Sequence, residues 1–142
     1  MFIGEYKHNI DDKNRVIIPS KFREGLGDVF VLTKGLDNCL FIYPHTEWIV
    51  FEDKLRNLPL TNQNARKFAR FFLSGAVECN VDKQGRILLP ASLRSYSGII
   101  KDVCFIGMSN RIEVWGSEQW DVYNADEFDA NELAEQMAEL GI

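Results

Sequence analysis

The chain has 142 residues, 46% of them hydrophobic and 26% charged, a composition typical of one ordinary folded domain. No apolar run approaches the roughly 18 residues of a membrane-spanning helix, and the amino end lacks the pattern of a targeting signal, so we expect neither a membrane span nor a leader. Cys39, Cys79 and Cys104 are odd in number and far apart, which argues against a disulfide framework or a zinc site and for reduced, buried thiols in a reducing cytosol.

Charge is unevenly distributed along the chain. The net charge of −5 argues at first against a nucleic-acid partner. However, residues 1–112 contain all 16 lysines and arginines together with 12 acidic residues, whereas residues 113–142 contain nine acidic residues and no basic one. An acidic tail therefore follows a mildly basic body, and this permits contact with a phosphate backbone without demonstrating it.

The first predicted elements are two short strands joined by a tight turn. They lie near Tyr6–Ile10 and at Arg15–Ile18, and the second strand stops at Pro19. Because proline has no N–H to leave unpaired, it suits the first position of a helix. We therefore expect a short helical turn after Pro19, ended by Gly25 and Gly27.

A hairpin and two helices follow. The bend of the hairpin is expected at residues 35–38, Gly-Leu-Asp-Asn. Thr46 is the expected N-cap of the next helix, which carries an apolar stripe and ends before Pro59. The stripe comprises Trp48, Phe51, Leu55 and Leu58. Residues 61–73 predict a further helix, with Arg66, Lys67 and Arg70 opposite its apolar side chains.

The second half of the chain repeats the first, and this is the strongest pattern in the sequence. Residues 10–23 align without a gap with residues 81–94, and aspartate, arginine, proline and arginine recur at identical spacing. The matching elements are strands at residues 76–81 and 86–89, a helical turn ended by Gly98, a bend at Ser109-Asn110, and a helix N-capped by Ser117 with Trp120 and Tyr123 on its stripe.

We therefore expect an α+β fold built from two tandem repeats. Residues 1–58 form the first repeat, residues 59–75 a connecting helix, residues 76–123 the second repeat and residues 124–142 an acidic C-terminal helix. The last helix begins after Phe128, can end at Gly141, and carries Leu133, Ala134, Met137, Ala138 and Leu140 on one face. We expect this apolar face to pack on the body or on a neighbouring subunit, away from the turns that contain Arg15 and Arg86.

The two D-x-x-x-R turns are the best candidates for a functional site. Asn14 and Gly85 precede the arginines, where the turn requires a residue that tolerates a positive φ. Lys13 and Lys83 are expected at the tips of the turns, so two basic loops result. Each Asp–Arg pair could be a clamp that holds the turn, or the arginine could contact a ligand. Repetition does not choose between these roles, because duplication copies a folding motif as readily as a functional one.

The two blocks resemble the MraZ family of bacterial transcription regulators, which is related to the AbrB and MazE swapped-hairpin DNA-binding domains. Each block is D-x-x-x-R followed by an apolar triplet, proline, three residues and arginine. The resemblance covers nearly the whole chain, from Met1 through the second tryptophan-bearing helix. It departs at Asn14, where the family usually has glycine, and we expect asparagine to adopt the same turn because it tolerates a positive φ.

This resemblance implies two AbrB-like, β-rich half-domains that form one pseudo-symmetric, β-barrel-like domain with peripheral helices and assemble into a ring-shaped homo-oligomer. It also implies contacts to double-stranded DNA by Lys13, Arg15, Lys83 and Arg86, with Asp11, Asn14, Asp82 and Gly85 structuring the turns. The expected target is short G-rich direct repeats upstream of the protein's own operon, which belongs to the division and cell-wall gene cluster. The expected location is the cytoplasm, in association with the nucleoid.

Other classes of protein have less support. His8 and His45 lack carboxylate or cysteine neighbours at ligand spacing, and no catalytic fingerprint is present, so we expect no metal, no cofactor and no catalytic residue. Ser20-Lys21 could suggest a Ser–Lys dyad, but the second repeat has Ala91-Ser92 instead. The main alternative is an antitoxin-like interaction module whose acidic tail (Glu118–Glu139) binds a basic site on another protein, and a remote β-barrel enzyme is the third.

Overall fold

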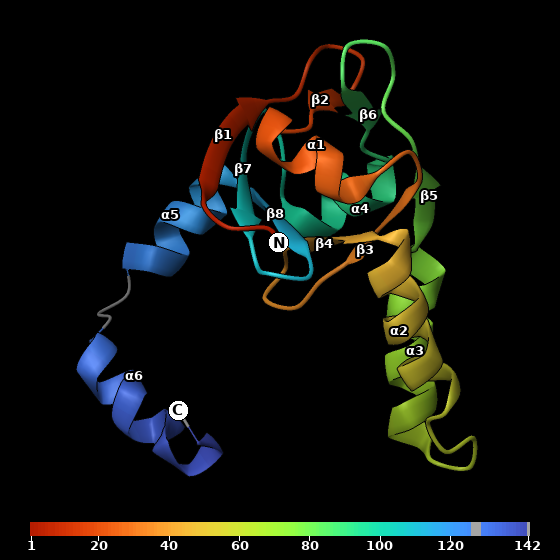
Figure 1. Ribbon diagram of the computed structural model, residues 1–142, viewed down its shortest axis with the longest axis vertical. Helices are drawn as coiled ribbons and strands as arrows, with labels where there is room; N and C mark the ends of the chain where they lie inside the picture. The colour runs from red at the N-terminus through yellow and green to blue at the C-terminus, as the bar shows by residue number, and fades with distance from the viewer. Residues whose placement is uncertain (126–128, 142) are drawn as a thin grey trace.

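The computed structural model describes residues 1–125 and 129–141 and contains two copies of one arrangement (Figure 1). The first copy comprises β1 (Glu5–Asn9), β2 (Arg15–Ile17), α1 (Ser20–Leu26), β3 (Phe30–Lys34), β4 (Leu40–Pro44) and α2 (His45–Arg56). The second comprises β5 (Val77–Cys79), β6 (Arg86–Leu88), α4 (Ala91–Ser97), β7 (Asp102–Gly107), β8 (Ile112–Gly116) and α5 (Ser117–Ala125). Helix α3 (Gln63–Gly75) joins them, and α6 (Ala130–Met137) with the short 3-10 helix η1 (Ala138–Leu140) follows.

The two copies exchange their first strands. The main sheet has the order β1-β7-β8-β4-β3-β5, so β1 pairs with the third strand of the second copy and β5 with the third strand of the first. β2 and β6 form a separate antiparallel pair that also joins the copies. Neither copy is therefore complete without the other, and the order of strands has a two-fold relation about the β4–β8 pair.

The sheet is not closed, which corrects the expectation of a barrel-like domain. In the described residues β1 and β5 each pair with one strand of the main sheet and form its two edges. The chain continues from β1 through the first turn into β2, and from β5 through the second turn into β6. The β2–β6 pair lies above the sheet in Figure 1.

Alternation along the strands gives the sheet two buried faces. Phe30 and Leu32 of β3 belong to a core with β2, β6, α1 and α4, whereas Val31 between them faces a second core with α2 and α3. Phe72 of α3 is 1% exposed in that second core, and its carbonyl accepts a hydrogen bond of 2.7 Å from Thr33 Oγ1. Val16 of β2 and Ile87 of β6 belong to the first core, so the strand pair that follows the two turns is packed against the buried sheet.

Several predicted helix boundaries are wrong by a few residues. Pro19 and Pro90 are N-caps of α1 and α4 rather than their first residues, and Gly25 lies inside α1, which ends at Leu26 with Gly27 as its C-cap. The N-cap of α2 is Pro44 rather than Thr46, because strand β4 runs directly into the helix. Ser117 is the first residue of α5 rather than its cap.

Helix α6 does not pack on the body of the chain with its apolar face. Met137 is half-buried, and every other described side chain from Asp129 to Leu140 is exposed. Three acidic or aromatic residues of the predicted tail, Asp126, Glu127 and Phe128, lie outside the described residues, as does Ile142. The expectation that the apolar face packs on the body of its own chain is therefore wrong, and packing on a neighbouring subunit stays a prediction.

Candidate nucleic-acid interface

The two D-x-x-x-R turns lie side by side at one end of the molecule, above the β2–β6 pair (Figure 1). Two hydrogen bonds of 2.9 Å continue that pairing into the turns: the N–H of Ile18 donates to the carbonyl of Gly85, and the N–H of Leu89 donates to the carbonyl of Asn14. Because each turn is bonded to the strand of the other repeat, the pair behaves as one surface rather than as two separate loops.

Each turn is held by its aspartate. Asp11 Oδ1 accepts from the backbone N–H groups of Lys13 and Arg15, both at 2.9 Å. Asp82 Oδ1 accepts from the N–H groups of Gln84 and Arg86 at the same distance. Asn14 (φ 62°) and Gly85 (φ 77°) both adopt the positive φ that the sequence predicts for the residue before the arginine, so asparagine does form the same turn.

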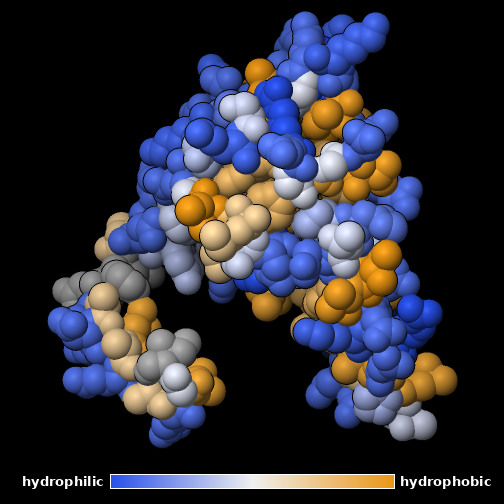
Figure 2. Space-filling view, in the orientation of Figure 1, coloured by the Kyte–Doolittle hydropathy of each residue, from blue (hydrophilic) through white to orange (hydrophobic). Residues whose placement is uncertain are grey.

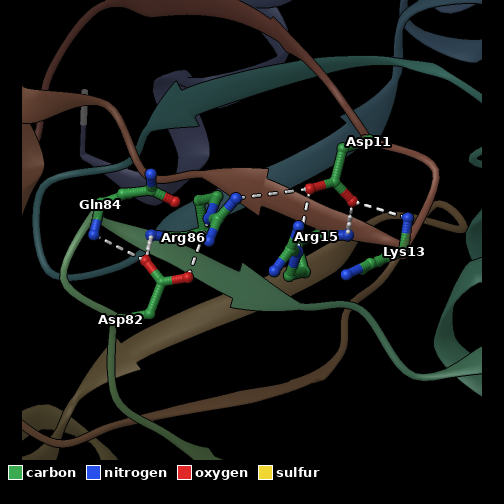
Figure 3. A network of polar contacts seen from close by, with 6 residues as sticks. All are labelled: Asp11, Lys13, Arg15, Asp82, Gln84 and Arg86. Atoms are coloured by element: carbon green, nitrogen blue, oxygen red, sulfur yellow. Dashed lines mark hydrogen bonds and ion pairs between the residues drawn. The ribbon is translucent and has the colours of Figure 1, made fainter.

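The second oxygen of each aspartate binds the arginine of the same turn (Figure 3). Arg15 Nε donates to Asp11 Oδ2 at 2.9 Å, and Arg86 Nε donates to Asp82 Oδ2 at 2.8 Å. Arg86 Nη1 also lies 3.8 Å from Asp11 Oδ2, which links the two turns. The clamp is therefore present in both copies, and it occupies one edge of each guanidinium rather than leaving the whole group directed into solvent.

These contacts leave part of each arginine accessible. The side chain of Arg15 is 29% exposed and that of Arg86 is 24% exposed. A guanidinium has five N–H donors, so an Nε bond to aspartate leaves the Nη atoms able to donate elsewhere. The clamp and the ligand contact are thus compatible: the carboxylate orients the group and reduces the entropy that a further contact would cost.

The carboxylates titrate below their ordinary range. The pKa of Asp11 and that of Asp82 are lowered from 3.8, chiefly because the backbone N–H groups of Arg15 and Arg86 donate to the charged form. Since the pKa is lower in the folded state, this contribution to stability is fully present above pH 3.8 and is lost as the pH falls through the folded-state value.

We expect carbon-detected NMR titration to give midpoints below 3.8 for both carboxyl groups. Arg15→Gln removes only the pairing in the first turn, so the midpoint of Asp11 should rise while that of Asp82 stays low. Midpoints at or above 3.8 in the unaltered protein would show that the turns are not held in this way in solution.

Lys13 and Lys83 are exposed at the tips of the turns. Residues 11–23 and 82–94, which include both turns and the first residues of α1 and α4, carry seven basic and three acidic side chains. This end of the molecule is thus basic in a chain whose net charge is −5. In Figure 1 the acidic helix α6 lies away from it, so its carboxylates do not oppose an approaching phosphate there.

Two further arginines lie beside the turns, and neither was predicted as a site residue from the sequence. Arg23 Nε donates to the carbonyl of Ile18 at 2.9 Å, and Arg94 Nε donates to the carbonyl of Leu89 at 3.0 Å. The Arg23 guanidinium lies so close to Gly85 that a Cβ added there would be 2.6 Å from Nη1 and Nη2. Their equal spacing after the two prolines was the available signal, since both recur in the aligned block.

The charges of Arg23 and Arg94 are not neutralised by nearby carboxylates. Within the described ranges, no Asp or Glu oxygen lies within 4.0 Å of either side chain. Burial lowers the pKa of His8, and the positive charge of Arg23 lowers it further. Both guanidinium groups are half-buried and held by a carbonyl, so they combine a fixed position with uncompensated charge.

Other kinds of site have no counterpart in the part of the chain that the structure describes. Residues 1–125 and 129–141 contain no group of three His, Cys, Asp or Glu side chains that could hold a metal ion. They also contain no helix with the length and apolar character needed to cross a membrane. Cys39 and Cys104 are buried and Cys79 is half-buried, each as a free thiol, and burial raises the pKa of Cys79 to about 11.

Comparison with known proteins gives one consistent result. The family model described as "MraZ protein, putative antitoxin-like" matches residues 1–71 and again residues 72–140. Proteins named transcriptional regulator MraZ from Clostridium acetobutylicum and Clostridium tetani are 61% and 59% identical over 142 residues, with the full length of each chain covered. The protein of that name from Acetivibrio thermocellus is 59% identical over 143 residues, again at full length.

Proposed function

The chain belongs to the MraZ family, and from that premise we propose that it regulates transcription by binding a specific DNA sequence with its paired turns. Its relatives carry the name of a transcriptional regulator, which is not an enzyme class. The observation that carries the proposal is the pair of clamped basic turns, joined through β2 and β6 and presented at one end of the molecule. This surface is positively charged and two-fold, and a double helix is negatively charged and also two-fold, so the two match in charge and in symmetry.

The basic residues divide into two roles. Lys13 and Lys83 lie at the tips and act as point charges for phosphate oxygens. Arg15 and Arg86 are oriented by aspartate, and their remaining N–H donors suit the O6 and N7 acceptors of guanine in the major groove. Arg23 and Arg94 add two fixed, uncompensated guanidinium groups to the same surface.

The proposed target is a set of short G-rich direct repeats upstream of the protein's own operon, which we place in the division and cell-wall gene cluster. One protomer presents a small surface, so its binding would be weak. A ring-shaped homo-oligomer would present the surface several times, and simultaneous contact with spaced repeats gains affinity through effective concentration. The direct repetition of the target, rather than a palindrome, fits head-to-tail copies around a ring. Such a protein acts in the cytoplasm, at the nucleoid.

Fluorescence anisotropy with the protein's own upstream DNA tests this proposal. The same duplex with its bases shuffled is the control, because counterion release makes every basic surface bind DNA to some extent. We expect the native duplex to bind about a thousandfold more tightly at physiological salt, the lower end of what specific regulators show. Equal affinity for the two duplexes would reject sequence-specific binding.

The tip lysines should control the salt dependence of binding. Replacing Lys13 and Lys83 with alanine removes two phosphate-binding charges per protomer, so the slope of log K against log salt should become shallower by about 1 for each lysine removed. The preference for native over shuffled DNA should stay, because these residues carry no base contact. The matched control is Lys54→Ala on α2. This helix lies away from the turns in Figure 1, so the substitution should leave the slope unchanged. An unchanged slope in the protein without Lys13 and Lys83 would show that these lysines do not contact phosphate.

A further inference from the structure

Helix α6 is an amphipathic helix that the rest of its own chain leaves uncovered. Leu133, Met137 and Leu140 lie on one face, and the exposed fraction is 40% for Leu133 and 72% for Leu140. Helical spacing places Asp129, Glu132 and Glu139 on one side of that face and Glu135 on the opposite side of the helix, and the described part of the tail contains no basic residue. In Figure 2, hydrophobic residues are visible on its surface. A short helix with this much exposed apolar surface requires a partner, because tertiary packing supplies most of the stability of helices in proteins.

A complementary groove lies on the α2–α3 pair. Its volume is about 380 Å³, and it is formed by the end of α2, the connecting loop and the start of α3. Leu58, Leu60 and Ala69 contribute to its apolar lining, and Leu60 is 81% exposed. Arg56, Arg66 and Arg70 surround this lining. Figure 2 shows hydrophobic residues exposed along this helix pair as well.

The charges at the groove are available to an acidic partner. In the described residues no carboxylate oxygen lies within 4.0 Å of Arg66 or Arg70. Arg56 approaches only Glu52 and Asp53, at 3.8 and 3.7 Å. Helix α3 itself carries Arg66, Lys67 and Arg70 and no acidic residue. An apolar floor with arginines at its border matches an apolar helix face bordered by carboxylates.

We propose that α6 of one copy of this chain docks in the α2–α3 groove of a second copy. Within one chain α6 and the α2–α3 pair project from different sides of the body (Figure 1), so in this conformation the groove of a chain is not filled by its own α6. The contact is heterologous, because a helix on one copy meets a groove on the next. Contacts of this kind generate a ring when the rotation closes. The inference rests on the proposed homo-oligomer and names the surfaces that hold it together.

Charge reversal in the full-length protein, followed by analytical ultracentrifugation, tests the contact. Arg70→Glu should raise the dissociation constant of the assembly by about tenfold or more, because like charges across an interface oppose association. Lys67→Glu is the matched control: it makes the same change on the same helix but does not line the groove, and it should leave the constant unchanged. Glu132→Lys with Glu139→Lys should weaken the wild-type assembly and restore that of the Arg70→Glu protein, because both carboxylates lie on the same border of the apolar face. Equal constants for wild type and Arg70→Glu would overturn the proposal, as would failure of the combined variant to recover.

Crosslinking identifies the occupant of the groove. A protein with Ala69→Cys and Leu133→Cys should form disulfide-linked chains of higher mass on mild oxidation, whereas each single variant should not. A crosslink confined within one chain, or none, would overturn docking between copies. Anisotropy with upstream DNA separates this from failure of the proposed function. If Arg70→Glu loses assembly but still prefers native DNA weakly, both proposals are supported. If the wild-type protein assembles but shows no preference for native DNA, only the DNA-binding proposal is rejected.

Discussion

Replacing Arg23 and Arg94 together with alanine is expected to weaken binding to the native upstream duplex by about 100-fold or more, since each guanidinium at a base contributes about 1–3 kcal/mol. Both groups are already held by a backbone carbonyl, so little entropy is lost when they bind. Neither has a carboxylate within 4.0 Å in the described residues, so the charge is free to act on DNA. The change removes one side-chain hydrogen bond per repeat, and the melting temperature should fall only slightly.

Lysine at the same two positions gives the decisive comparison. Arg23→Lys with Arg94→Lys keeps the charge but lacks the planar fork of donors, so it should restore the salt dependence of binding without restoring the preference for native DNA. If lysine restores the full affinity, the two arginines contact only phosphate. If the alanine variant binds as wild type with a native melting temperature, Arg23 and Arg94 do not contribute to DNA binding.

The repeat predicted the elements but not their pairing. Strands at Arg15–Ile17 and Arg86–Leu88 and the hairpins that follow them lie where the aligned blocks place them. The two halves, however, have strands with the same apolar pattern, so β1 could pair with the third strand of either copy on pattern alone. The structure selects the exchange, with Tyr6 opposite Phe105 in the second copy. Tertiary contacts decide such pairings, and a periodic pattern does not contain them.

The chemistry of the turns was only partly predictable for a related reason. The sequence shows an aspartate four residues before an arginine, which fits both a clamp and a ligand site. Only the geometry shows that one aspartate oxygen is used by two backbone N–H groups and the other by Nε of the arginine. The sequence shows that Arg23 recurs as Arg94 at equal spacing, but the contact of Arg23 with Gly85 was not predictable, because it crosses from one repeat to the other.

That contact makes a test possible in which no charge is removed. Gly85→Ala should lower the melting temperature by about 2–5 °C, since a left-handed alanine costs on the order of 1 kcal/mol. It should also weaken DNA binding by about tenfold, because the new Cβ, 2.6 Å from Nη1 and Nη2, forces the Arg23 guanidinium to move.

A double-mutant cycle separates strain in the turn from displacement of the arginine. In the Arg23→Ala protein there is no guanidinium to displace, so adding Gly85→Ala should still lower the melting temperature but should cause no further decrease in DNA affinity. Asn14→Gly is the matched control in the first turn: it relieves a positive φ of 62° and should raise stability slightly without weakening binding. Additive decreases in affinity across the cycle would mean that Gly85→Ala acts through the turn and Arg86, and not by displacing Arg23. We expect the double variant to bind DNA as weakly as Arg23→Ala alone, because both substitutions act on DNA affinity through the same group, the Arg23 guanidinium.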